Sequence, residues 1–191
     1  MKKYLVIIVA IVAVVALWVV VKYNNFVKAA ESMNTAWGQV ENVYQRRADL
    51  IPNLVAVVKD YADFEQETIL AVTEARAKAT ATTISVNGGD EGQFQAFENA
   101  QDALGQSLNR LLATIEAYPE LKANEQYLTL QAQLSGCENR ILVERNRFNE
   151  QAKAYNQSIR RFPGSIVANM FGFEKRPYFA ASEGADVAPQ R

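Results

Sequence analysis

An uninterrupted apolar stretch from Tyr4 to Val21 constrains the fold of this chain more than any other feature. It contains about 18 residues and no charged residue, glycine or proline, and a helix needs roughly 17–25 such residues to cross the hydrocarbon core of a bilayer. Lysines flank it on both sides, and aromatic rings lie near its ends, where they favour the headgroup level. The sequence therefore predicts one membrane-spanning helix, which includes Tyr4, Leu5, Val12, Leu17, Trp18 and Val21.

Two other uses of an apolar N-terminus fit this stretch poorly. A cleaved signal peptide has an apolar core of about 7–15 residues followed by a small-x-small cleavage site, and the nearest equivalent here is Ala29-Ala30. A lipid-modified terminus would need a cysteine at its end, whereas the only cysteine is Cys137. We therefore expect residues 1–23 to form an uncleaved single-pass anchor.

The composition narrows the functional classes open to the rest of the chain. The formal net charge is −1, from 20 basic and 21 acidic residues, so no basic excess indicates nucleic-acid binding. Histidine, the commonest general acid or base and transition-metal ligand, is missing from the sequence. Asp and Glu residues do not cluster with metal-ligand spacing either. We predict no cofactor, no metal site and no catalytic residue, and we identify no small-molecule substrate.

The charges around the apolar stretch bear on its orientation. Lys2, Lys3 and the terminal amine favour a cytoplasmic N-terminus by the positive-inside rule. Lys22, Lys28 and an arginine pair follow the stretch and weaken this bias, partly offset by acidic residues. We expect the soluble part to lie on the extracytoplasmic side.

Helical periodicity resumes directly after the apolar stretch. Residues recur at steps of three and four, as on one face of a helix, with Arg47 as the charged exception: Trp37, Val40, Tyr44, Arg47, Ile51, Leu54, Val58 and Tyr61. Pro52 interrupts this pattern, because it has no N–H and its ring clashes with the preceding turn. Two interpretations are open. One is a long kinked helix, and the other is a tight turn with Asp49 as the N-cap of a new helix.

Two further helical patterns follow a loop over Thr82–Asp90. The first begins at Asp90 or Gln93 and stops before Pro119, since the residue before a proline disfavours helical angles. The second runs from near Asn124 to Phe162. No strand pattern is present in the sequence. We predict an all-α fold in which short connections make neighbouring helices antiparallel.

Several motifs, in order along the chain, together resemble the LemA family of bacterial membrane proteins. They include Arg46-Arg47-Ala48-Asp49-Leu50-Ile51-Pro52-Asn53-Leu54-Val55, Tyr118-Pro119-Glu120-Leu121-Lys122-Ala123-Asn124, Glu138-Asn139-Arg140-Ile141, Phe171-Gly172-Phe173 and Pro177-Tyr178-Phe179. The resemblance implies a single-pass anchor in the bacterial cytoplasmic (inner) membrane. It also implies an up-and-down four-helix bundle of long helices over residues 24–179, which favours the turn at Pro52. It implies no mechanism, because the family has no settled biochemical activity. Residues 180–191 are small and polar, and we expect a disordered tail.

Arg46 and Arg47 are the first candidate partner contacts. They could bind a carboxylate of a partner or ligand; the alternative is that they cap helices and pair with acidic residues of a neighbouring helix. Arg47 and Glu144 both lie on apolar stripes, and a half-buried charge without a partner is costly. We therefore expect each to be paired inside the bundle, with the Arg47–Glu144 pair as one option.

The second candidate contact is the aromatic segment that contains Phe171, Phe173, Tyr178 and Phe179. It either covers one end of the bundle as a lid or forms an exposed apolar patch for a partner. In an up-and-down arrangement the last helix returns toward the membrane, so this segment is expected near the bilayer or a membrane partner.

The anchor, the regular helices and the lack of a catalytic constellation favour a membrane-tethered, non-catalytic scaffold or adaptor for partner proteins. A self-assembling protein that shapes the membrane or organises the envelope is the second hypothesis. An enzyme or sensor is the third, and it requires a pocket lined by converging polar side chains. A histidine-free chain is not a histidine kinase.

Overall fold

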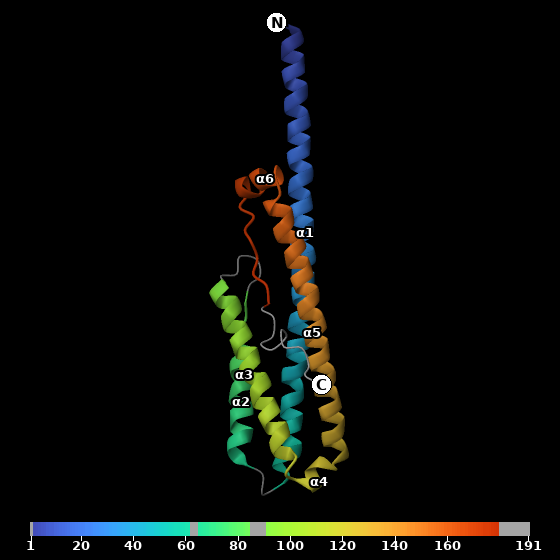
Figure 1. Ribbon diagram of the computed structural model, residues 1–191, viewed down its shortest axis with the longest axis vertical. Coiled ribbons are helices and arrows are strands. Elements are labelled where there is room, and N and C mark those ends of the chain that lie inside the picture. The colour runs from blue at the N-terminus through green and yellow to red at the C-terminus, as the bar shows by residue number, and fades with distance from the viewer. Residues whose placement is uncertain (1, 62–64, 85–90, 180–191) are drawn as a thin grey trace, which may run out of the picture.

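The computed structural model describes residues 2–61, 65–84 and 91–179, and every regular element in these ranges is a helix. The helices are α1 (Lys2–Lys59), α2 (Gln66–Ala81), α3 (Glu91–Ile115), α4 (Pro119–Lys122), α5 (Glu125–Arg160) and α6 (Gly164–Met170). Figure 1 shows the N-terminal half of α1 projecting beyond the other helices, which gather around its C-terminal half. The all-α prediction is confirmed for the described residues. The predicted tail, residues 180–191, lies outside them.

α1 joins the apolar stretch to the rest of the protein without a break. At 1.5 Å per residue its 58 residues span about 87 Å. The sequence from Tyr4 to Trp37 contains neither glycine nor proline, so none of the usual causes of a helix kink is present where the apolar stretch ends. The stretch is long and apolar enough to cross a membrane. Its side chains are exposed except those of Trp18 and Val19, which are partly buried.

Pro52 lies inside α1, so the turn that the family resemblance favoured is not present. α1 continues to Lys59. Because proline has no N–H, the carbonyl of Ala48, four residues earlier, loses its helical donor. The Nε of Arg76 in α2 donates to that carbonyl at 2.7 Å. A side chain from the next helix therefore supplies the missing hydrogen bond, and the helix passes through the proline.

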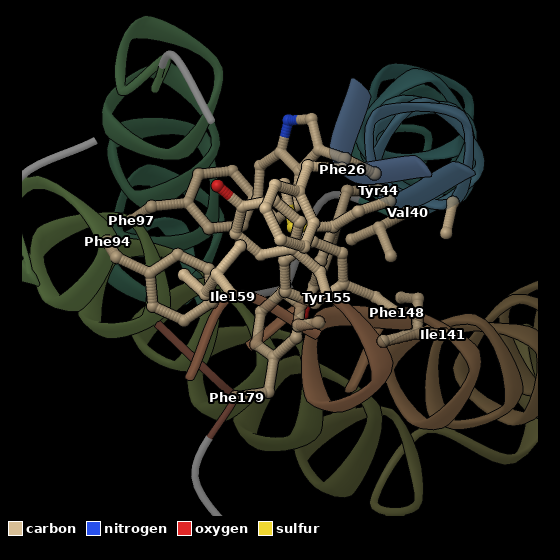
Figure 2. Packing of buried hydrophobic residues seen from close by; sticks show 14 of the residues in the cluster. Phe26, Val40, Tyr44, Phe94, Phe97, Ile141, Phe148, Tyr155, Ile159 and Phe179 are labelled. Carbon is tan, nitrogen blue, oxygen red and sulfur yellow. The ribbon is translucent and has the colours of Figure 1, made fainter. Parts of the chain in front are cut away.

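The helices pack as two pairs, with α1 along α5 and α2 along α3. Their buried faces form two apolar clusters. The aromatic cluster, shown in part in Figure 2, joins α1, α3, α5, α6 and the C-terminal residues, and includes Phe26, Trp37, Phe94, Phe148, Tyr155 and Phe179. The aliphatic cluster lies farther from the apolar stretch and includes Ile51, Leu54, Leu104, Leu111 and Leu134. Most residues of the three predicted stripes are buried.

α5 begins where predicted and ends two residues early. Asn124 caps it, because its side-chain oxygen accepts from the backbone N–H groups of Gln126 at 2.9 Å and Tyr127 at 3.1 Å. Phe162, expected as the last residue of this helix, lies beyond its end and is 82% exposed. The reason is that α5 stops at Arg160 and the chain turns into α6.

The segment after α5 contains a helix that the sequence did not reveal. α6 has seven residues, too few to display helical periodicity. It lies beside α1, and the chain then runs back between α3 and α5 (Figure 1). We call the non-helical residues 173–179 the strap. The strap accounts for the difference in length between the 36-residue α5 and the 25-residue α3, since it packs beside the part of α5 that α3 does not reach.

Candidate functional site

Arg47 is a buried cation at the centre of the protein, only 3% exposed. Its Nη2 donates to the main-chain oxygen of Gln101 at 3.0 Å and to the side-chain oxygen of Gln101 at 2.8 Å. Its Nη1 pairs with Oε1 of Glu138 at 2.9 Å. The guanidinium also lies 5.1 Å from the centre of the Tyr44 ring. α1, α3 and α5 are therefore joined through one side chain.

A second ion pair lies beside the first and also links α3 to α5. Arg145 of α5 pairs with Glu98 of α3 at 3.1 Å, and both side chains are largely buried. The Arg145 guanidinium lies 4.6 Å from the centre of the Phe179 ring. We call Arg47, Glu98, Gln101, Glu138 and Arg145 the polar layer. The aromatic and aliphatic clusters lie on either side of Arg47 along α1.

An open cleft of about 760 Å³ lies over the polar layer, between α3 and α5. The two arginines and the carboxylates of Glu98, Asp102 and Glu138 make its charge close to neutral. Amide side chains complete its polar rim: Gln95, Asn99, Gln101, Gln106 and Asn109. In residues 2–61, 65–84 and 91–179, no group of three or more histidine, cysteine, aspartate or glutamate side chains is placed to hold a metal ion.

The electrostatics of the cleft suit binding of polar groups. Burial raises the pKa of Tyr44, against the lowering influence of the nearby Arg145 and Arg47, so the phenol is neutral at physiological pH. The Glu138 side chain is half exposed while that of Arg47 is buried. The Nη1 contact of Arg47 therefore ends on a half-exposed carboxylate, whereas its Nη2 contacts with Gln101 are buried.

Two asparagines of α5 hold the strap, a contact that was not predicted from the sequence. Asn149 accepts from the Phe179 N–H at 2.8 Å and donates to its carbonyl at 3.0 Å. Asn156 bonds in the same way to both main-chain groups of Arg176, at 2.8 and 2.9 Å. Seven helical residues rise about 10.5 Å, and three extended residues cover about 10 Å. The two spacings match, so each amide meets the backbone of one strap residue.

The predicted candidate contacts fall in different environments. Arg46 is exposed, whereas Arg47 is the buried core of the polar layer. Phe179 is 4% exposed and packs against the rings of Phe94 at 4.8 Å and Phe148 at 5.5 Å. Phe171, Phe173 and Tyr178 lie at or near the surface, and their role as partner contacts stays a prediction.

The expected pairing of buried charges is found, but the Arg47–Glu144 pair is not. Arg47 pairs with Glu138, and Glu144 accepts from Nη1 of Arg147 in its own helix at 3.3 Å. Six residues separate Glu138 from Glu144 on α5, so the two carboxylates lie on different sides of the helix. Periodicity placed Glu144 correctly on the buried stripe, but it could not rank two glutamates as partners.

Comparison with known proteins places the chain in a family. The model of the LemA family matches residues 36–190. The magnetosome protein MamQ of Magnetospirillum gryphiswaldense is 28% identical over 189 residues, which cover 88% of this chain and 70% of the relative. The magnetosome protein MamQ 1 of Paramagnetospirillum magneticum is 27% identical with the same coverage. Protein LemA of Metamycoplasma hominis is 24% identical over 160 residues, 84% of this chain and 69% of the relative. With the family match extending over most of its length, the chain belongs to the LemA family.

Proposed function

We propose that this protein is a non-catalytic scaffold, held by α1 in the bacterial inner membrane, that presents the cleft between α3 and α5 to a partner protein. In this proposal α1, α2, α3 and α5 form an up-and-down four-helix bundle on the extracytoplasmic side. The partner contributes polar and acidic side chains that meet the polar layer.

The observation that carries the proposal is the continuity of α1. A flexible linker of n residues has a root-mean-square end-to-end distance of about 5–6 Å × √n, so the soluble part would have no fixed position relative to the anchor. Here the helix that is apolar enough to cross a membrane also supplies Arg47 to the floor of the cleft. The cleft therefore has a fixed height and direction relative to the anchor, which is what a scaffold needs and a diffusing enzyme does not.

The arrangement of the charged groups supports a binding role. Arg47 pairs with Glu138 and Arg145 pairs with Glu98, and both pairs join different helices. Two of the relatives described above are named after the magnetosome, which associates them with a cell structure rather than a reaction, and this favours an organising role.

The proposal is tested by photocrosslinking in the native cell. A photoreactive phenylalanine analogue replaces Gln106, an exposed residue that lines the cleft, or Lys78, an exposed residue of α2 outside it. We expect one defined protein to be captured from Gln106 and not from Lys78. Capture of only other copies of this chain would replace the scaffold with self-assembly. Equal capture at both positions, or none, would refute the cleft as a docking site.

Orientation is tested separately with reporters fused after Arg191. Alkaline phosphatase folds into an active enzyme only outside the cytoplasm, and green fluorescent protein exported through the same route stays dark. We expect phosphatase activity without fluorescence. The opposite result would place the cleft in the cytoplasm and exclude extracytoplasmic partners.

The cleft also favours a second candidate function, a sensor for a small carboxylate-bearing ligand. The volume of the cleft is in the range of small-molecule sites, about 300–1,000 Å³. Glu138, the ion-pair partner of Arg47, is half exposed, so the carboxylate of a ligand could take its place. A thermal-shift screen of the full chain in detergent against carboxylic acids tests this. A shift that is lost in Arg47→Met would support a sensor, and no shift across the screen would refute it.

A further inference from the structure

α6 carries an exposed apolar face that no other helix covers in the described part of the chain. We call α2 to α6, the strap and the part of α1 after Val21 the body. Ile166 and Met170 lie four residues apart, on the same side of the helix, and are 57% and 63% exposed. Phe162 just before α6 and Phe171 just after it are also exposed, whereas Val167 and Ala168 are buried in the aromatic cluster. Four large exposed apolar side chains in or beside one short helix form a patch of the kind that marks an interaction site.

α6 is fixed to α1 just beyond the end of the apolar stretch. The rings of Phe171 and Tyr23 lie 4.9 Å apart, and a Cβ at Gly164 would lie 3.2 Å from the Phe26 ring. Tyr23 and Phe26 follow Val21 by two and five residues, or about 3 and 7.5 Å along the helix. The headgroup layer on each side of a bilayer is roughly 5–8 Å thick. α6 thus lies at the level of the headgroups of any bilayer that α1 crosses.

Contacts within the apolar stretch point to the same level. Trp18 and Val19 are partly buried and pack against the aromatic cluster, to which α6 contributes Val167 and Ala168. The body therefore reaches the last turn of the stretch itself. Figure 1 shows α6 lying across the end of α5 and beside α1. No glycine or proline lies between the apolar stretch and the residues of α1 that contact α6. α6 therefore cannot move away from the end of the apolar stretch without breaking these contacts.

The charges around α6 suit an anionic lipid surface. Lys22 follows the apolar stretch, Arg160 and Arg161 precede α6, and Lys175 follows it. Glu174 is the nearby acidic residue of this segment. Interfacial helices combine an apolar face with flanking basic residues that meet anionic headgroups.

We propose that the apolar face of α6, with Phe162 and Phe171, inserts into the headgroup–acyl boundary of the same bilayer that α1 crosses. The occupant of the patch is lipid, because Phe171 packs on Tyr23, two residues beyond the apolar stretch, at the depth where such a helix binds. This second contact goes beyond the scaffold role and rests only on α1 being a membrane span. It opposes tilting of α1 and the helices packed on it, because tilting would lift α6 out of the membrane surface.

Spin labels on the full chain test the proposal. Single cysteines replace Met170, Ile166, Val12 in the apolar stretch, and the exposed Lys153 on α5, in a Cys137→Ala background. Each labelled protein is reconstituted into vesicles of phosphatidylethanolamine and phosphatidylglycerol. Collision rates with oxygen, which concentrates in lipid, and with a water-soluble nickel chelate give the depth of each label. We expect labels at Met170 and Ile166 to report lipid about 5–10 Å below the phosphate level, with Lys153 in water and Val12 deeper in the bilayer.

The outcomes separate this inference from the anchor. Aqueous labels at both Met170 and Ile166, with Val12 in lipid, would overturn insertion of α6 and leave the span intact. Labels shielded from both oxygen and nickel would show that protein covers the patch, which also overturns the proposal. An aqueous label at Val12 would remove the membrane span and the scaffold proposal with it. Two α6 positions are used so that poor folding of one variant does not decide the result.

Discussion

The hydrogen bond from Arg76 to the carbonyl of Ala48 can be tested by a double-mutant cycle with Pro52. In the structure this bond replaces the N–H donor that Pro52 lacks. Arg76→Met removes the replacement donor. Pro52→Ala restores the natural one, because an alanine at position 52 donates its own N–H to the carbonyl four residues earlier. The two substitutions should therefore compensate each other.

The expected energies follow from the kind of hydrogen bond involved. A bond from a charged group contributes about 1.5–3 kcal/mol, so Arg76→Met should lower the free energy of unfolding by that amount while Pro52 is present. With Pro52→Ala the carbonyl keeps a neutral donor worth about 1 kcal/mol. The cost of Arg76→Met should then fall by about 1 kcal/mol. This coupling exceeds the roughly 0.3–0.5 kcal/mol within which independent substitutions add.

The measurement is urea unfolding of the full chain in a mild detergent, followed by far-ultraviolet circular dichroism. Arg110→Met serves as the matched control, since Arg110 is an exposed arginine of α3. It should cost little and show no coupling to Pro52→Ala. If Arg76→Met costs the same with proline or alanine at position 52, the Arg76 bond does not replace the missing donor and the explanation for the unbroken helix fails.

Three further predictions concern the strap, the polar layer and a buried tyrosine. Asn149→Leu removes two hydrogen bonds worth about 1 kcal/mol each, so hydrogen exchange at the Phe179 amide should become roughly 30-fold faster. Asn146 is exposed, and Asn146→Leu should leave this exchange rate unchanged. Similar effects of the two substitutions would contradict the role of Asn149. Arg47→Met leaves the Gln101 oxygens without their donor, while the Glu138 side chain becomes hydrated. The unfolding free energy, measured by urea titration, should fall by about 1–3 kcal/mol. An unchanged urea midpoint would argue against the pairing of Arg47 with Gln101 and Glu138. Burial raises the pKa of Tyr44, so its contribution to stability is complete below the unfolded pKa of about 10 and is lost as the pH rises through the higher folded pKa. The urea midpoint should therefore fall as the pH rises above about 10, and less steeply in Tyr44→Phe; equal slopes would exclude Tyr44 as a cause.

Pro52 shows where inference from sequence reached its limit. The periodic stripe through Ile51 and Leu54 supported one continuous helix, and the local chemistry of proline supported a turn. The deciding contact comes from Arg76, which is 24 positions away from Pro52 and lies in another helix. Neither helical periodicity nor turn chemistry contains information about such a contact, so the two interpretations could not be separated before the structure.

One feature of the sequence, the spacing of two asparagines, does indicate the strap contact. The all-helical architecture and the buried stripes followed from periodicity, because long helices repeat their pattern many times. The strap has no such pattern. However, Asn149 and Asn156 lie seven residues apart on α5, beside its apolar stripe, and two amides one heptad apart match the spacing of an extended chain. That spacing is a signal that a search for helical faces alone does not use.

The strap and α6 also connect the cleft to the end of the apolar stretch. Phe179 lies under Arg145, one of the two arginines of the cleft, and the strap leads back from there to α6 at the end of the apolar stretch. α1 makes the same connection through about 39 Å of helix between Val21 and Arg47. α1 and the strap therefore reach different residues of the cleft, Arg47 and Arg145. If α1 crosses the membrane as proposed above, this fixed length of helix holds the cleft near the membrane surface, and we expect its partner to be another membrane-bound protein.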